Sequence, residues 1–370
     1  MIHILCLLIS TTMAYQSILI MRHGARDPHT WTEIDRNFLW IVDPTILTEK
    51  GVKQLIQLGV NQQREDIFDA SGNCIYETLE LQSSKSARCT SSIVCFIKGL
   101  CPQNYADILH RLFQEYYQPY VTNQTAYDEI MNSNFEDPLA LNFEAFNKPL
   151  DYMFQGQKNN TCPKVQTVNK AVQSSAKYKQ QEKELLSRAE FDKVYYWIQE
   201  ANPSTVIDKS KLTLSDVDEF YDDFFCNRFE GFNFPNPDQD TQNYINEVEQ
   251  FLVYFGANSE PLQHYAGVSE PFRWIIKQLS SSQSLSVYSG TESNQMAMLS
   301  VLTEQQYLTP FASQLEFVIQ GQRVYIYYNK QFLKASYCQS DFYCTKQELI
   351  NYLSKYVVNN LQEQCNSNEE

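Results

Sequence analysis

Apolar runs that end abruptly in polar turns recur along this chain. Residues 18–21 form a continuous β-favouring run, which ends in a basic turn at 22–28. Such a run predicts a strand that is buried on both faces. Residues 79–83 and 285–289 repeat the arrangement, and each is followed by a loop and an apolar helical segment. These three strand-loop-helix units predict an α/β domain whose loops face one crevice at the carboxyl ends of the strands.

Apolar residues at helical spacing predict the helices that pack on this sheet. In the segment 47–64, Val52, Leu55 and Val60 fall on one face, and Thr48 is a candidate N-cap. The alternating residues near the C-terminus predict a β-hairpin that turns at Asn329 and Lys330. The other predicted elements are helices at 87–101, 269–279 and 345–359, a helix that ends at 302, and hairpin strands at 323–328 and 331–336.

The two ends of the chain are expected to lie outside the fold. Residues 1–14 have an apolar centre and small residues at Thr12 and Ala14, which is typical of a secretory signal peptide that is removed. A basic start is missing, and the alternative is that this segment forms the first strand or helix of the fold. The acidic residues 362–370 are expected to form a loose tail. Without residues 1–14, about 355 residues remain, enough for one large domain with an inserted second domain.

The net charge of −15 narrows the range of partners. An excess of acid argues against nucleic acid or an anionic membrane. Beyond the first segment, no stretch approaches the roughly 20 apolar residues of a membrane span, so no stable membrane anchor is expected. The sequence therefore predicts a protein that is secreted, or located in a lysosome or vacuole. Glycosylation acceptors at Asn123 and Asn159 agree with that route.

The cysteines are odd in number once Cys6 is set aside with the first segment, so at least one thiol is expected to be free. Cys89 and Cys95 lie on a predicted buried helix and are expected to act as small apolar residues. The spacings fit no zinc pattern well. Connectivity is left open by the sequence. The candidate disulfide pairs are Cys338 with Cys344, and Cys162 with Cys365.

The basic turn after the first strand carries the candidate chemistry. Arg22, His23 and Arg26 lie together in the stretch Arg-His-Gly-Ala-Arg-Asp-Pro. A neutral imidazole is a competent nucleophile toward phosphorus, and guanidinium groups can hold phosphoryl oxygens bidentately. Gly24 is expected to let the backbone turn tightly around the imidazole. Arg88, in the first turn of the second helix, is expected to face the same crevice, although spacing alone explains it equally well as a solvated residue.

The stretch 22–28 resembles the signature Arg-His-Gly-x-Arg-x-Pro of the histidine acid phosphatases, a family that includes the phytases. The block 83–92 resembles the part of that family that supplies a third phosphate-binding Arg, here Arg88. The helix at 47–64 resembles a second family landmark, to which we assign a structural role. In this comparison His23 is the nucleophile that forms a covalent phosphohistidine.

The resemblance also implies the architecture. The family has an α/β domain with a central, mostly parallel sheet flanked by helices, and an inserted, mostly helical cap. Here the α/β domain would comprise 15–104 and 272–361, and the cap 105–271. The cap segment is rich in Tyr, Phe, Asn and Gln, has helical periodicity and contains a proline-bearing loop at 233–240.

The third strand-loop-helix unit departs from the family pattern. The family carries Tyr-Ser-x-His-Asp, in which the His binds phosphate and the Asp protonates the leaving oxygen. Here residues 288–292 read Tyr-Ser-Gly-Thr-Glu, so Thr291 replaces the His and Glu292 replaces the Asp. Some members of the family carry His-Ala-Glu at this place instead, and compared with them this chain lacks the His as well.

This departure bears on the rate. Thr291 can give phosphate one hydrogen bond but no charge, and the loss could cost about 2 to 4 kcal/mol, or ~10² to 10³ in rate. Glu292 is the candidate general acid. The alternative is that it only stabilises the start of a helix. His29 is near enough in sequence to reach the mouth of the pocket.

The sequence thus predicts an acid phosphatase that acts on small phosphomonoesters, without a metal or another cofactor. Its predicted phosphate-binding residues are Arg22, Arg26, Arg88 and Thr291. The main alternative is a weak or inactive relative that binds phosphorylated ligands. A carbohydrate-binding or structural secreted glycoprotein would require the first motif to be accidental. Whether the chain forms a homodimer is left open.

Overall fold

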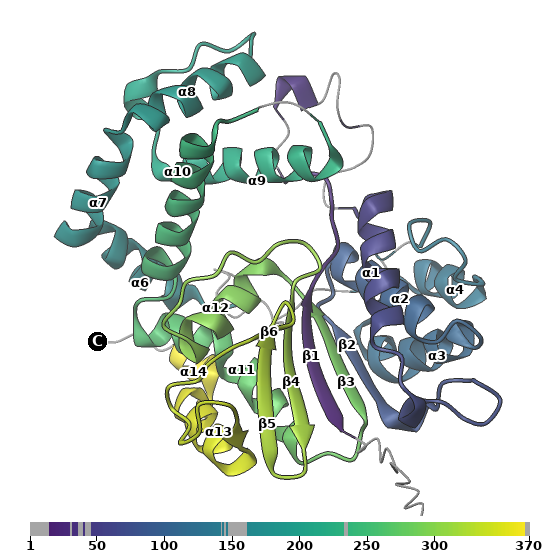
Figure 1. The fold of residues 1–370 in the computed structure, drawn as a ribbon. Helices are drawn as coiled ribbons and strands as arrows, with labels where there is room; N and C mark the ends of the chain where they lie inside the picture. Colours follow the sequence, from purple (N-terminus) through teal and green to yellow (C-terminus); the bar gives the residue numbers. More distant parts are fainter. Residues whose placement is uncertain are drawn as a thin grey trace, which may run out of the picture.

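A mixed β-sheet forms the centre of the molecule, with helices on both faces (Figure 1). The computed structural model describes residues 15–29, 32–35, 40, 46–141, 143, 146, 161–232 and 236–366. Within them the sheet has seven strands in the order β2-β3-β1-β4-β5-β6, and β7 pairs with β5. The strands are β1 (Gln16–Arg22), β2 (Leu79–Ser83), β3 (Leu285–Gly290), β4 (Gln314–Gln320), β5 (Arg323–Tyr328), β6 (Gln331–Phe332) and β7 (Cys344–Thr345).

The predicted α/β fold is confirmed, with the parallel strands β2, β3 and β1 together on one side of the mixed sheet. β3 lies between β1 and β2 and is parallel to both. β4 is antiparallel to β1 and to β5, and it has no counterpart among the predicted strands. The predicted hairpin turn is confirmed, since Asn329 and Lys330 both have positive φ, as the tightest hairpin turns require. The strand after this turn is shorter than predicted.

Helices cover both faces of the sheet and join it to the rest of the chain. The helices are α1 (Glu49–Asn61), α2 (Ala87–Leu100), α3 (Tyr105–Leu112), α4 (Gln124–Asn132), α6 (Pro163–Ser174), α7 (Ala176–Leu186), α8 (Ala189–Ala201), α9 (Leu214–Glu230), α10 (Gln239–Gln250), α11 (Pro261–Leu279), α12 (Glu292–Leu302), α13 (Lys346–Leu353) and α14 (Leu361–Asn366). Short 3₁₀ or π helices are η2 (Glu65–Ile67), η3 (Tyr76–Thr78), η4 (Phe113–Tyr117), η5 (Gln118–Tyr120), η7 (Lys209–Lys211), η8 (Phe251–Gly256) and η9 (Ser354–Tyr356).

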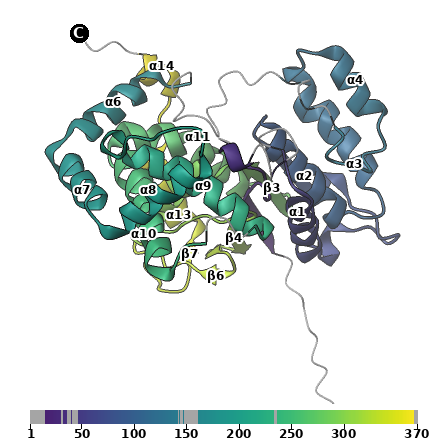
Figure 2. The same cartoon turned by 90° about the horizontal axis from the view of Figure 1, so that it is seen from above.

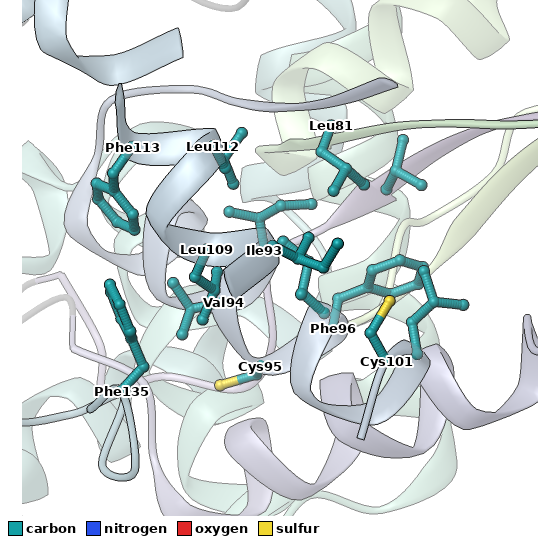
Figure 3. Packing of buried hydrophobic residues seen from close by; sticks show 14 of the residues in the cluster. Leu81, Ile93, Val94, Cys95, Phe96, Cys101, Leu109, Leu112, Phe113 and Phe135 are labelled. Atoms are coloured by element: carbon teal, nitrogen blue, oxygen red, sulfur yellow. The ribbon is translucent and has the colours of Figure 1, made fainter. Parts of the chain in front are cut away.

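The two faces of β1 are buried in two different hydrophobic clusters, as the continuous apolar run predicts. Leu19 and Met21 belong to a cluster that includes α1, α2 and α3. Ile18 and Ile20 belong to a second cluster, with residues of α11, α12, β4 and β5. Figure 3 shows part of the first cluster, where side chains of α2 and α3 pack together and against Leu81 of β2. The strand that carries the basic turn is therefore held firmly on both sides.

Helices α1 and α2 cross at two glycines. A Cβ atom on Gly59 would collide with the backbone oxygen of Phe96, and one on Gly99 would collide with the backbone oxygen of Ile56. The helices can approach this closely only because both positions lack a side chain. This contact fixes α2, whose first turn bears Arg88. Thr48 caps α1 as predicted, since its hydroxyl accepts a hydrogen bond from Gly51 N.

A third hydrophobic cluster lies in the helices at one end of the sheet. It contains residues from Leu185 to Val248, which belong to α7, α8, α9 and α10 and the segment between them. Residues of α3 and α4 instead pack with the sheet in the first cluster, beside α1 and α2 (Figure 2). The packing thus distinguishes 105–146 from the later helices. The division of the chain into the predicted domains stays a prediction.

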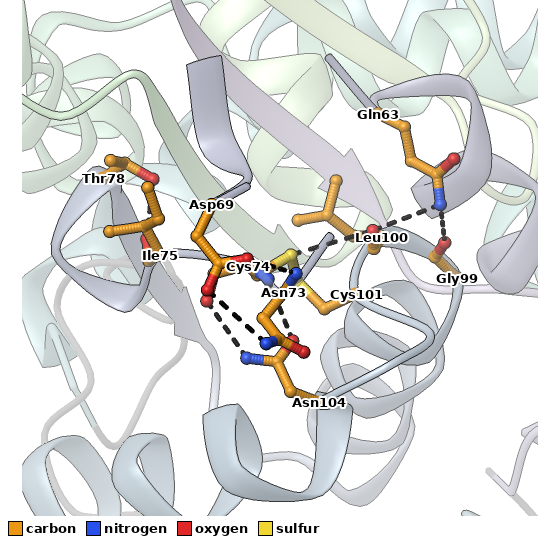
Figure 4. Close-up of a disulfide and its surroundings, with 10 residues drawn as sticks. All are labelled: Gln63, Asp69, Asn73, Cys74, Ile75, Thr78, Gly99, Leu100, Cys101 and Asn104. Atoms are coloured by element: carbon orange, nitrogen blue, oxygen red, sulfur yellow. Dashed lines mark hydrogen bonds between the residues drawn. A yellow bond between two sulfur atoms is a disulfide. The ribbon is translucent and has the colours of Figure 1, made fainter. Parts of the chain in front are cut away.

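Three disulfides join parts of the chain that the structure describes. Cys338–Cys344 and Cys162–Cys365 are the two pairs considered from the sequence. The third, Cys74–Cys101, ties the loop before β2 to the end of α2, where Asn104 also hydrogen-bonds both backbone groups of Cys74 (Figure 4). The thiols of Cys95 and Cys226 are free and buried, and that of Cys89 is buried as well.

The expectation of a loose tail from 362 is wrong for its first part. Residues up to Asn366 form α14, and Cys365 is buried and bonded to Cys162. A disulfide and an apolar contact through Leu361 hold this segment in place. The predicted signal peptide, the acceptor Asn159 and residues 367–370 lie outside the described residues, as does part of the loop at 233–240. No described helix has the length and hydropathy needed to cross a bilayer.

Candidate active site

The basic turn leaves the carboxyl end of β1 and is fixed by backbone contacts on three sides. His23 N donates to Gly290 O at 2.9 Å, and His23 O accepts from Ala312 N at 3.0 Å. Gly24 N donates to Ser92 Oγ at 3.1 Å. Gly24 does not have positive φ; a Cβ there would meet Gly51 O at 2.7 Å, so this glycine allows close approach to α1 rather than an unusual turn.

The ring of His23 is held in one tautomer. Its Nδ1 lies 2.8 Å from Gly24 O, and since a carbonyl oxygen can only accept, Nδ1 carries the proton. Nε2 then presents its lone pair, and it has no hydrogen-bond partner among the described residues. Burial lowers the pKa of His23 well below its usual value, and the charges of Arg88, Arg22 and Arg26 lower it further. Burial and the neighbouring arginines therefore favour the neutral imidazole.

Arg22 is 1 % exposed and held on several sides. One guanidinium nitrogen donates to Thr309 O, and the other lies 2.8 Å from Glu292 Oε2. The ring of Phe311 stacks 4.6 Å from the guanidinium carbon. These contacts fix the direction of the fork, which is what bidentate recognition of an oxyanion requires.

Arg26 pairs with a residue that the sequence did not single out. Its two terminal nitrogens meet the carboxylate of Asp222 at 2.7 and 3.1 Å, and Asp222 also accepts from His29 N. Burial alone would lower the pKa of Arg26, but the charge of Asp222 raises it above its usual value. Burial alone would raise the pKa of Asp222, but the charge of Arg26 lowers it below its usual value. Asp222 lies on α9, so this ion pair joins the basic turn to the helices above the sheet.

Arg88 lies at the second position of α2 and lines the same cavity as His23. No described carboxylate forms an ion pair with its guanidinium, and its Nε is buried without a hydrogen-bond partner. Burial lowers the pKa of Arg88, and the positive charges of Arg26 and Arg22 lower it further. A guanidinium remains charged under these conditions, so this one lacks an anion.

Glu292 and Thr291 begin α12, at the end of β3. The Glu292 carboxylate contacts Arg22, and its second oxygen, Oε1, is buried without a partner. Burial raises the pKa of Glu292 above that of an ordinary carboxyl, and Arg22 opposes part of the rise. The Thr291 hydroxyl lies 2.6 Å from Asn294 Oδ1 and serves the helix cap. Its predicted role in phosphate binding stays a prediction.

These residues line one cavity of about 290 Å³. All six residues proposed from the sequence line it, and His29 lies at it as well. The opposite wall comes from α9, α10 and η8. Within the described residues, no group of three or more His, Cys, Asp or Glu could hold a metal ion. The lining residues that sequence reasoning missed are Asp218, Glu219, Tyr221, Asp222, Glu249, Val253 and Ser293.

One signal for the missed wall exists in the sequence. Asp218 and Asp222 are four residues apart, and like charges at that spacing disfavour an isolated helix. Such a pair indicates that tertiary contacts stabilise one of the carboxylates, as Arg26 does here for Asp222.

Comparison of the structure with solved structures identifies the fold. A phytase from Hafnia alvei superposes with a TM-score of 0.63 over 94% of this chain and 98% of its own, at 13% identity. A phytase from Citrobacter braakii gives the same values. A multiple inositol polyphosphate phosphatase from Bifidobacterium longum, in complex with inositol hexasulfate, has a TM-score of 0.59 at 15% identity, over 94% of this chain and 93% of its own. No protein-family model and no curated protein sequence matches this chain.

Proposed function

Starting from a chain with the fold of the histidine acid phosphatases, we propose that it hydrolyses phosphomonoesters through a covalent phosphohistidine at His23. The observation that carries the proposal is the state of this imidazole. Its tautomer is set by Gly24 O, and its burial among three arginines that line the same cavity favours the neutral form. A neutral nucleophile among fixed positive charges suits attack on an anionic phosphoryl group.

The first step would transfer the phosphoryl group to the ring. His23 Nε2 forms the bond to phosphorus while the bond to the ester oxygen breaks, in line. Arg88, which has no anionic partner among the described residues, would supply the first charge for the phosphate, and the forks of Arg22 and Arg26 would share its oxygens with their carboxylates. Glu292, protonated, would give its proton to the departing oxygen.

Phosphate binding itself would help to protonate Glu292. In the free site Arg22 contacts this carboxylate and favours its charged form. A phosphate that binds Arg22 takes over that positive charge and brings its own negative charge near Glu292, and both changes raise the pKa of the carboxyl. The carboxyl of Glu292 would therefore be protonated, and able to act as the general acid, when the substrate is bound.

The second step would return the enzyme to its starting state. A water molecule attacks phosphorus, and the P–N bond breaks so that the electron pair returns to Nε2. The carboxylate of Glu292 accepts the proton of that water. Inorganic phosphate then leaves. No step requires a metal ion or an organic cofactor.

A second candidate function is binding without useful turnover. Thr291 stands where the related signature has a second His, and its hydroxyl is engaged in the cap of α12. His29 lies at the cavity, but it is exposed. A site with this deficiency could retain phosphate affinity while the rate is low.

Turnover of a simple aryl phosphate near pH 5 separates the two candidates. We expect the wild type to release phosphate, and His23→Ala to lose this activity while it still binds vanadate or phosphate. Absence of turnover in the wild type, together with phosphate binding, would favour the second candidate. The three disulfides support our further proposal that the protein is secreted, or located in a lysosome or vacuole.

A further inference from the structure

The wall of the cavity that faces the arginines is acidic. Asp218, Glu219 and Asp222 lie on α9, and Glu249 lies near the end of α10. Asp222 is neutralised by Arg26. The other three carboxyls form no ion pair with any Lys, Arg or His in the described ranges of the chain. One side of the cavity therefore favours an anion and the other favours a cation.

Glu249 has an unsatisfied atom in this wall. The residue is only 5 % exposed, and its Oε2 is buried without a hydrogen-bond partner. Burial raises the pKa of Glu249 well above its usual value, and a hydrogen bond and repulsion from Asp218 raise it further. A buried carboxyl beside a second carboxylate, with one oxygen unpartnered, lacks both a donor and a positive charge.

An ammonium group would supply what is missing. It has three N–H donors and one positive charge, so it could bind Asp218 and the free oxygen of Glu249 together and favour the ionised form of Glu249. A second phosphate on the leaving group would instead meet carboxylates. The cavity of about 290 Å³ also suits a small leaving group.

We propose that Asp218 and Glu249 bind an ammonium group on the alcohol part of the substrate, so that the preferred substrates are phosphate monoesters of small amino alcohols. This inference rests on the proposed function, because it takes the arginines and His23 as the place where the phosphate binds. This preference would differ from that of the multiple inositol polyphosphate phosphatase from Bifidobacterium longum, whose name specifies a substrate with several phosphates.

Binding to a protein without its nucleophile tests the proposal independently of turnover. In His23→Ala, 3-aminopropyl phosphate and propyl phosphate can be compared by calorimetry at pH 5.5 without being consumed. We expect the amine to bind at least tenfold more tightly, which corresponds to about 1.4 kcal/mol. Inositol hexakisphosphate should bind His23→Ala more weakly than 3-aminopropyl phosphate does.

Two variants and a control locate the effect. Adding Glu249→Gln, or Asp218→Asn, to His23→Ala should reduce the preference for the amine to less than threefold. Asp218 is partly exposed, so its variant is expected to fold even if the buried Glu249→Gln does not. Asp240→Asn on α10 removes the same charge at an exposed position outside the cavity and should leave the preference unchanged.

The outcomes separate this inference from the function on which it rests. Equal affinity for the two phosphates in His23→Ala, or a preference that survives Asp218→Asn, would overturn the ammonium site even if the wild type hydrolyses aryl phosphates. Absence of turnover in the wild type with a tenfold preference in binding would overturn the enzyme proposal and retain the ammonium site.

Discussion

Replacement of Glu292 by Gln tests the general acid. The change removes the proton donor and keeps the size and position of the side chain at the start of α12. Esters of alcohols need a proton on the leaving oxygen, whereas activated aryl leaving groups need much less. We therefore expect a large loss of kcat/KM for propyl phosphate and a small one for 4-nitrophenyl phosphate.

The size of the difference follows from the contacts of Glu292. Positioned proton transfer contributes about 10² to 10⁴ in rate. Because Glu292 lies 2.8 Å from Arg22, Gln also removes a negative charge that competes with phosphate for that guanidinium, which offsets part of the loss for both substrates. We expect a loss of ~10³ for the alkyl ester and less than ~10 for the aryl ester. The difference, ~10², corresponds to about 2.7 kcal/mol in activation free energy.

The pH dependence gives a second readout of the same group. Burial raises the pKa of Glu292, so its proton persists to higher pH than that of an exposed carboxyl. The rate with the alkyl ester should fall as pH rises through this pKa, because the donor is then lost. Glu292→Gln should lack that decline. Ser293→Ala is the matched control: it changes the neighbouring residue at the cavity, which carries no titrating proton, and should show no dependence on the leaving group.

Two results would refute this reasoning. Equal losses on the alkyl and aryl esters would show that Glu292 supports the site without transferring a proton. A decline with pH that persists in Glu292→Gln would assign that titration to another group.

Two further predictions concern the departure from the related signature and the helix crossing behind the site. Thr291→His should raise kcat/KM for aryl phosphates by up to ~10², because it adds a charged donor, and should lower the melting temperature, because loss of the cap costs about 1 kcal/mol; an unchanged rate would mean that another group already fills this role. Gly99→Ala should lower the free energy of unfolding in urea by about 1 to 3 kcal/mol or more, because its Cβ would collide with Ile56 O. The control Gly321→Ala lies at a position with open space but positive φ, and it should lower the free energy of unfolding by less.

The α/β half of the structure could be predicted because its signals are local. The apolar run before Arg22 is buried on both faces of β1, and Arg88 and Glu292 each fall in the first turn of a helix that directly follows a parallel strand. Parallel strands bring such turns to one edge of the sheet. The six residues at the cavity were therefore predictable from their positions after three strands taken together with the resemblance to the family signature.

The acidic wall could not be predicted in the same way. Asp222 and Glu249 reach the cavity only because α9 and α10 pack above the carboxyl ends of the strands, and nothing local to those helices specifies that placement. The fate of the C-terminal segment also depends on a distant residue, since Cys162 holds Cys365 across 203 positions of sequence. Contacts between distant segments decide both cases.

The most direct test of the central claim is to trap the covalent intermediate. The wild type, mixed with radiolabelled aryl phosphate near pH 5 and quenched in denaturant, should carry phosphate that is labile in acid and stable in alkali. Mass spectrometry should locate it on His23. Turnover without a trapped phosphoprotein, or label on another residue or in His23→Ala, would contradict the account.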